Sequence, residues 1–185
     1  MAVSVKNKQE EEDFLLIDDD ENTVQHQKFL TFLTERESYG INIRDIIEII
    51  EIQKIIEVPD TPEAIKGVIN LRGRIIPVMD VRIRFNIKER AYDDRTCIVV
   101  VTVKNTTLGF IVDTVEEVVE IPEEHIEPAP RFRNSNSIRS DYIMGLGKVN
   151  DQVKILLDIQ KILFNEELEN ISELNGEADE ESAAQ

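Results

Sequence analysis

The 185-residue sequence lacks several features that usually indicate a compartment or a mode of membrane attachment. It has one cysteine, Cys97, which excludes an internal disulfide framework; its place at the start of an apolar run predicts a small buried side chain in a reducing compartment. No apolar run approaches the roughly 18–20 residues that cross a bilayer, and the first residues do not resemble a signal peptide. We therefore expect a cytosolic protein without direct membrane insertion.

Patterns of catalytic and metal-binding residues are also missing. The two histidines, His26 and His125, have no carboxylate or thiol at ligand spacing. The seven glycines form neither a dinucleotide-binding fingerprint nor a P-loop, and no serine lies in a nucleophile elbow. These absences predict a protein that is not an enzyme and that needs neither a metal nor another cofactor.

Basic residues are scarce at the two ends of the chain, which accounts for most of the net charge of −17. Residues 1–24 carry a net charge of −6 and residues 166–185 carry −8, so that only −3 remains for residues 25–165. Segments with many acids and few apolar residues cannot bury enough surface to fold. We therefore expect acidic, disordered arms at residues 1–24 and 169–185 around a folded domain at residues 25–168.

The folded part contains an internal repeat. Residues 29–52 align without a gap with residues 98–121, 69 positions later, and residues 65–85 align with residues 143–163, 78 positions later. Apolar residues mostly stand opposite apolar residues, and the order of the two blocks is preserved. Matched pairs include Gly40 with Gly109, Glu48 with Glu117, Gly67 with Gly145 and Asp80 with Asp158.

The composition of each copy predicts an all-β fold. β-branched residues are abundant and turn signals recur at short intervals, which favours five short strands per copy. Five strands close into a small barrel that hides its sheet edges. We therefore predict two five-stranded β-barrels, about 28–90 and about 95–164, with short helices and a C-terminal helix. Asp80 and Asp158 each follow an apolar strand and precede a helical pattern, so both are predicted to be helix N-caps.

A cluster of basic residues within Arg72–Arg95 raises nucleic acid as an alternative partner. Seven arginines and lysines stand there against four acids, and small barrels can bind single strands when cations are combined with stacking aromatics. The chain has no tryptophan, and only Phe85 and Tyr92 are aromatic in this window. A solvated, salt-bridged face is therefore the preferred interpretation, with nucleic-acid binding as the second hypothesis.

The two copies differ at one predicted hairpin turn. Asn70, Leu71, Arg72 and Gly73 stand opposite residues 148–151, where Asn150 replaces the arginine. Because the same fold closes this hairpin with an ordinary turn residue, the turn itself does not require Arg72. Arg72 is therefore a candidate contact, suited to bidentate hydrogen bonding with a carboxylate or carbonyl of a partner, with a bystander role as the alternative.

Several stretches resemble the CheW family of bacterial chemotaxis coupling proteins. They are "IKGVINLRGRIIPVMDVRIRF", "DYIMGLGKV", "VKILLDIQKIL" and the doubled "GI.I....IIEI" pattern, and the resemblance extends from about Lys28 to Asn165. It implies two SH3-like barrels and an adaptor without catalytic activity. The implied partners are the cytoplasmic tips of chemoreceptors and the regulatory domain of the histidine kinase CheA, in arrays at the inner face of the membrane.

The resemblance also assigns candidate binding residues. The receptor-contacting groove of the family lies near the N-L-R-G turn, which implies a binding role for Asn70, Leu71, Arg72 and Gly73, with Gly67 as structural support of the turn. Ile46 and Glu48 match a second region used in coupling. Because Glu117 stands at the place equivalent to Glu48, a purely structural reason for this glutamate is the alternative.

Overall fold

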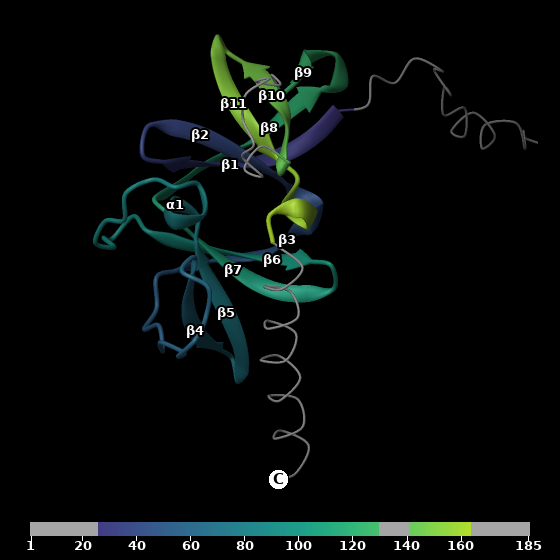
Figure 1. The fold of residues 1–185 in the computed structure, drawn as a ribbon. Helices are drawn as coiled ribbons and strands as arrows, with labels where there is room; N and C mark the ends of the chain where they lie inside the picture. Colours follow the sequence, from purple (N-terminus) through teal and green to yellow (C-terminus); the bar gives the residue numbers. More distant parts are fainter. Residues whose placement is uncertain (1–25, 130–140, 164–185) are drawn as a thin grey trace, which may run out of the picture.

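The computed structural model describes residues 26–129 and 141–163, and these residues form mainly strands (Figure 1). The predicted acidic arms and C-terminal helix lie outside the described residues. The first part of the chain contains β1 (His26–Thr34), β2 (Glu37–Asn42), β3 (Ile46–Glu51), β4 (Ile65–Leu71) and β5 (Arg74–Asp80). The second part contains β6 (Cys97–Val103), β7 (Thr106–Val112), β8 (Thr114–Pro122), β9 (Ile126–Pro128), β10 (Ile143–Val149) and β11 (Gln152–Leu157).

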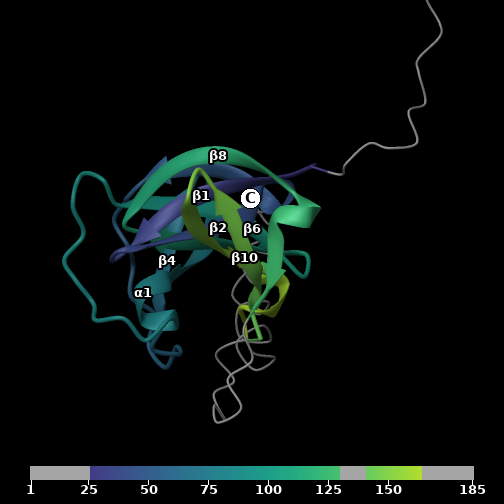
Figure 2. The same cartoon turned by 90° about the horizontal axis from the view of Figure 1, so that it is seen from above.

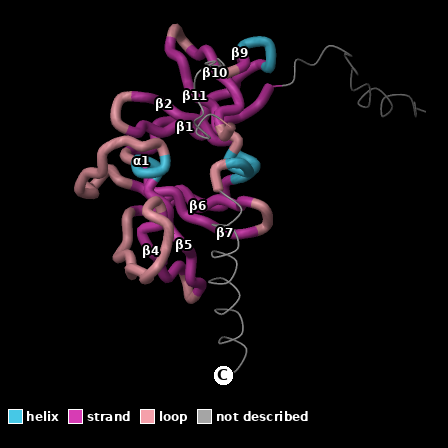
Figure 3. The backbone as a smooth tube through the Cα atoms, viewed as in Figure 1, coloured by secondary structure: helices cyan, strands magenta, loops and turns pink. Residues whose placement is uncertain are grey.

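The helical elements are short and follow strands, as Figure 3 shows. They are α1 (Val81–Arg84) and the 3-10 turns η1 (Ile43–Asp45), η2 (Glu123–His125) and η4 (Ile159–Lys161). Asp80 caps α1 by accepting a hydrogen bond from the N–H of Arg82 at 2.8 Å, and Asp158 caps η4 by accepting one from the N–H of Gln160 at 3.2 Å. The prediction that both aspartates are caps is confirmed.

The strands form two curved sheets. One has the order β8-β1-β2-β11-β10-β9 and the other has the order β3-β6-β7-β5-β4. The outer strands of the first sheet, β8 and β9, follow each other in the chain through η2, and Figure 2 shows the curvature of β8 beside β1. In the second sheet, Ile56 continues the chain from β3 and pairs with Val68 of β4, with N to O distances of 2.8 and 2.9 Å. Each sheet thus closes on itself as an SH3-like barrel, and the all-β prediction is confirmed.

The division of the chain between the barrels differs from the prediction. The hairpin β1–β2 pairs with β8 and β11 of the second copy, and the hairpin β6–β7 pairs with β3 and β5 of the first copy. Barrels at 28–90 and 95–164 are therefore wrong, because the two copies exchange their first hairpins. The apolar pattern specifies which face of a strand is buried, and since both copies carry the same pattern it does not specify the partner strand.

The strand registers confirm the repeat itself. Phe29 faces Val119 in one barrel and Ile98 faces Ile50 in the other, a pair of contacts related by the offset of 69. In the parallel pairs, Gly40 faces Leu156 and Gly109 faces Val78, which are related by the offsets of 69 and 78. The same pairing is therefore built twice.

The largest apolar cluster joins the two barrels. It contains buried residues from β1, β2, β6 and β7 together with α1 and η4, whereas each barrel has a smaller interior cluster of its own. Four stacked rings cross this junction, with centroid distances of 4.6–5.8 Å between neighbours: Phe32, Tyr39, Phe85 and Tyr142. The half-buried Cys97 packs against the same cluster. Because each barrel completes the other and both share this core, the described residues form one cooperative unit.

Two polar contacts reinforce the junction from opposite ends. Arg82, which follows β5, binds Asp113, and the carboxylate of Asp113 also accepts the backbone N–H of Glu35 in the β1–β2 turn at 2.8 Å. Gln160 is the repeat equivalent of Arg82; its amide oxygen accepts the backbone N–H of Lys104 in the β6–β7 turn at 2.8 Å. Each contact thus joins an element that follows one barrel to a turn of the other.

One buried lysine distinguishes the two barrel interiors. The side chain of Lys154 in β11 is only 3% exposed, and its ammonium group lies 3.3 Å from the carboxylate of Glu116 in β8. Glu116 also accepts the hydroxyl of Ser38. Ile76 occupies the equivalent position in the other barrel, where it is buried. An apolar side chain therefore fits this fold at the lysine position.

We predict that Lys154→Ile leaves the free energy of unfolding unchanged or raises it by about 1–3 kcal/mol. The free energy lost by burying an ammonium group is about as large as the free energy gained from its ion pair. Glu116→Ala should instead lower the free energy of unfolding by about 1–3 kcal/mol, because it leaves the lysine buried without its carboxylate. Denaturant unfolding measures both changes. An equal loss of stability in the two variants would show that the lysine itself stabilises the barrel.

Candidate functional site

The turn between β4 and β5 holds its central residues in the left-handed region of backbone space. Arg72 has φ 53° and Gly73 has φ 88°, and the side chain of Asn70 accepts the N–H of Gly73 at 2.8 Å. In the equivalent turn between β10 and β11, Asn150 has φ 47°. Asparagine tolerates this conformation, whereas a longer non-glycine side chain costs about 1–2 kcal/mol there. The arginine is therefore a poor local choice for this turn.

Arg72 forms a bidentate ion pair with Glu48 of β3. One guanidinium nitrogen, Nη2, lies 2.8 Å from Oε2 of Glu48, and Nη1 lies 3.2 Å from Oε1. The side chain of Arg72 is 77% exposed, whereas that of Glu48 is 23% exposed. The structure thus brings together two candidate residues from separate regions of the sequence. The sequence predicted that Arg72 binds a carboxylate or carbonyl of a partner. In this chain by itself, Arg72 binds the carboxylate of Glu48.

Stability alone does not account for Arg72. An exposed ion pair contributes about 0–1 kcal/mol, which at most offsets the strain of the left-handed backbone. The other barrel closes the equivalent turn with Asn150 and needs no such pair. The feature that distinguishes this turn is therefore a charged, hydrogen-bonding group held at the surface by a carboxylate.

The flanking residues of β3 form an apolar strip on the surface. Ile47 and Ile49, which we call the β3 strip, are 53% and 43% exposed. Ile46, which the sequence analysis assigned to the binding region, is instead half-buried and packs against the central core. The sequence of this strand, Ile-Ile-Glu-Ile-Ile-Glu, does not alternate apolar and polar residues, so it does not show which isoleucines are exposed, and Ile47 and Ile49 were missed. Glu48 lies between them in the strand, with its side chain on the opposite, less exposed face.

Gly67 supports the site from within β4 and not from a turn. It lies at a β-bulge with φ 133°, and a Cβ atom there would lie 2.1 Å from the carbonyl oxygen of Ile56. This carbonyl accepts the N–H of Val68 and so helps to close the barrel. Gly67 therefore admits the backbone of a neighbouring segment, whereas the sequence analysis predicted a supporting role in the turn.

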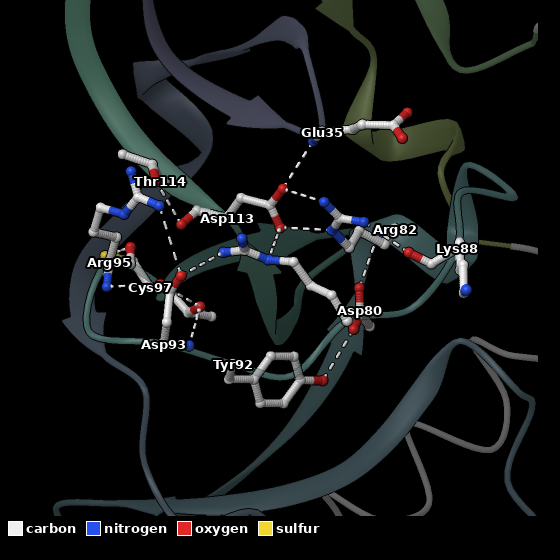
Figure 4. A network of polar contacts seen from close by, with 12 residues as sticks. Glu35, Asp80, Arg82, Lys88, Tyr92, Asp93, Arg95, Cys97, Asp113 and Thr114 are labelled. Carbon is white, nitrogen blue, oxygen red and sulfur yellow. Dashed lines mark hydrogen bonds and ion pairs between the residues drawn. The ribbon is translucent and has the colours of Figure 1, made fainter.

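The basic run Arg72–Arg95 is largely neutralised by nearby acids. Arg82 binds Asp113 through two hydrogen bonds of 2.8 and 2.7 Å, and both side chains are largely buried (Figure 4). Arg90 lies 3.4 Å from the same carboxylate and 3.1 Å from Asp93, which also lies 3.7 Å from Arg95. The hypothesis of a phosphate-binding patch loses its basis, since these cations are shared among carboxylates.

Burial and charge act in opposite directions on the acids of this network. Burial alone would raise the pKa of Asp113, but hydrogen bonds from Arg82 and from the Glu35 N–H, with the charges of Arg82 and Arg90, hold it below its usual value. Burial raises the pKa of Asp80, although the hydroxyl of Tyr92, 3.0 Å away, and the N–H of Arg82 oppose the change. The ionised form of Asp113 therefore stabilises the fold.

The described residues hold no group of three or more histidine, cysteine or acidic side chains arranged to bind a metal ion. Among the same residues, no helix is long and apolar enough to span a membrane. His125 lies 3.9 Å from its neighbour Glu124 on the exposed turn η2. Within residues 26–129 and 141–163, the surface around Arg72 is the candidate site.

Comparisons with known proteins agree on the nature of the domain. The sequence model of the CheW-like domain matches residues 28–167. The chemotaxis protein CheW of Klebsiella aerogenes is 37% identical over 142 residues, which cover 77% of this chain and 84% of that protein. The chemotaxis protein CheW of Helicobacter pylori is 32% identical over 146 residues, which cover 79% and 85% of the two chains.

A solved structure gives the same result for the fold. The crystal structure of the scaffolding protein TtCheW from Thermoanaerobacter tengcongensis matches with a TM-score of 0.69 and 34% sequence identity. The match covers 77% of this chain and 96% of that one.

We predict that Asp113→Asn lowers the free energy of unfolding at neutral pH by about 2–4 kcal/mol, because it leaves the buried Arg82 without its carboxylate. The folded-state pKa of Asp113 lies below its unfolded value of about 3.9, so its stabilisation is present above that pH and is lost as pH falls through the folded pKa.

Denaturant unfolding of both proteins at several pH values tests this prediction. The difference in stability should be constant between about pH 5 and 7 and should shrink below about pH 4. Asp93→Asn is the matched control, since Asp93 binds arginines of the same network from a more exposed position and should change stability much less. A difference that persists unchanged in acid would contradict the assignment to an ionised Asp113.

Proposed function

The chain belongs to the CheW family, and we propose that it is a non-enzymatic adaptor that couples chemoreceptors to the histidine kinase CheA. The observation that carries this proposal is the exposed Arg72–Glu48 pair, built at a cost in backbone strain on one barrel and absent from the equivalent turn of the other. A polar group kept at the surface against local preference is expected where a partner binds.

The proposed receptor contact combines this pair with the neighbouring turn and strand. Asn70 to Gly73 form the tip of the β4–β5 hairpin, and Glu48 lies opposite them on β3. The exposed Ile47 and Ile49 supply apolar surface beside the charged pair. Apolar contact with a few fixed polar groups suits a helical segment, which is the form that we propose for the receptor tip.

The kinase contact is proposed for another barrel surface. The two barrels are built from equivalent hairpins but carry different surface residues, so one unit can present two unlike faces. The partner on the kinase side is the regulatory domain of CheA. We place the complex in the cytoplasm, in arrays at the inner face of the membrane, with no nucleic acid and no cofactor taking part.

Two separate NMR titrations of the isotope-labelled chain test the adaptor proposal. One uses a soluble fragment of a chemoreceptor tip and the other uses the regulatory domain of CheA. We expect two distinct sets of shifted amides, with the receptor set including Glu48 and residues 70–73. If the chain binds neither partner but binds an oligonucleotide tightly and in a salt-dependent way, the second hypothesis, nucleic-acid binding, would be favoured.

We predict that Arg72→Ala weakens binding to the receptor fragment about tenfold, which corresponds to about 1.4 kcal/mol. Arg72→Asn, which installs the residue of the sister turn, should weaken binding similarly while stability stays equal or rises, because asparagine tolerates the left-handed backbone. Titration calorimetry and denaturant unfolding measure the two effects.

The matched control is Arg74→Ala, which removes an exposed arginine two positions further along the same hairpin. It should leave receptor affinity within about twofold of the original. Unchanged affinity in both Arg72 variants would remove this residue from the proposed site, whereas equal losses in the Arg72 and Arg74 variants would indicate a general charge effect.

A further inference from the structure

The described chain ends close to the start of β3. Ile162 and Leu163 are buried in the central core, against which Ile46 also packs. Three residues before this end, the side-chain nitrogen of Gln160 lies 3.4 Å from the carboxylate of Asp45, the residue that precedes β3. The last described residues therefore lie near the start of β3.

The sequence of that segment is suited to covering an apolar surface. Phe164, Leu168, Ile171 and Leu174 recur at intervals of three or four residues, the spacing that gathers apolar side chains on one face of a helix. Residues 164–175 also contain four glutamates and no basic residue. Asn175 and Gly176, which follow the last apolar position, are typical of a helix end.

The length of the segment matches the length of the strip. Ile47 and Ile49 lie two and four positions beyond Asp45, which corresponds to about 7 and 13 Å along an extended strand. Twelve residues in helical conformation span about 18 Å. A segment that starts at Leu163 therefore reaches both isoleucines without a linker.

Charge at the start of this path favours an acidic occupant. Arg44 on η1 and Lys104 in the β6–β7 turn are exposed. The side chain of Gln160 forms hydrogen bonds with Asp45, the neighbour of Arg44, and with the backbone N–H of Lys104, so both cations lie near the end of the described chain. Within residues 26–129 and 141–163, neither cation is recorded in an ion pair. These two cations can pair with glutamates of an acidic segment, whereas Asp45 and the exposed Glu51 have the opposite charge, so the strip itself is contacted through apolar side chains.

We propose that residues 164–175 dock on the β3 strip of their own chain and cover Ile47 and Ile49. The contact lies beside the Arg72–Glu48 pair, so an intramolecular segment occupies the surface on which, under the proposed function, the receptor binds. Docking is then a device that reduces receptor affinity until a partner displaces the segment. Only this regulatory consequence depends on the proposed function; the docking itself does not.

NMR spectroscopy of the full-length isolated chain tests the docking without any partner. Ile49→Asp places a charge in the strip, and we expect the amides of residues 164–175 to shift and to lose protection from hydrogen exchange. Val118→Asp is the matched control, because Val118 is the repeat equivalent of Ile49 on β8 and is also exposed. It should leave the amides of residues 164–175 unchanged.

The reciprocal variants change the segment and report on the strip. Leu168→Asp and Ile171→Asp should shift the amides of Ile47 and Ile49, whereas Asn170→Asp, which adds the same charge off the apolar face, should not. All shifts should be independent of protein concentration over about a tenfold range, because the contact is intramolecular.

Three results would overturn the docking proposal: no response of the segment to Ile49→Asp, an equal response to Val118→Asp, or shifts that grow with protein concentration, which would indicate a second copy as the occupant. The regulatory consequence has its own readout. Leu168→Asp should raise affinity for the receptor fragment several-fold. If docking is observed without this gain, the docking proposal stands and the proposed receptor-binding surface is wrong.

Discussion

The exchange of hairpins between the two copies is the constraint on which the rest of the structure depends. Each barrel takes its first hairpin from one copy and its remaining strands from the other. The faces of β1, β2, β6 and β7 that do not line a barrel interior then meet in one central core. Since no barrel is complete without both copies, separation of the barrels would expose this core and open both sheets at once. Two similar folding units thereby act as one rigid body.

The repeat makes this chain its own control for separating structural from functional residues. Asp80 and Asp158 perform the same capping role in both copies, so their duplication has a structural cause. Arg82 and Gln160 differ in charge but perform the same joining role between barrels. Arg72 differs from Asn150 in a way that the turn does not require and that the backbone disfavours. A difference that costs stability and serves no packing role is the one that points to a partner.

Local features of this fold could be predicted from the sequence, whereas the choice of neighbouring strands could not. The caps, the repeat and the Asn70–Gly73 turn follow from short-range chemistry, which acts within a few residues. The exchange of hairpins involves strands far apart in the chain that carry equivalent apolar patterns, so periodicity cannot choose between them. The same limit applies to exposure: β3 has four isoleucines in the order Ile-Ile-Glu-Ile-Ile-Glu, and only the folded barrel shows that Ile47 and Ile49 are the exposed ones. The pairing of Arg72 with Glu48 likewise required the closed barrel.

A scaffold needs surfaces that differ in chemistry but keep a fixed spatial relation. Duplication alone would give two similar faces, and two separate barrels joined by a linker would leave their relative position free. In this chain the shared core fixes the relative position, while divergence at surface positions makes the faces unlike. The buried Lys154 in one barrel and Ile76 in the other show that divergence extends even to the interiors without changing the fold. The rigidity of the junction and the freedom of the surface residues to diverge are therefore two consequences of the same exchange of strands.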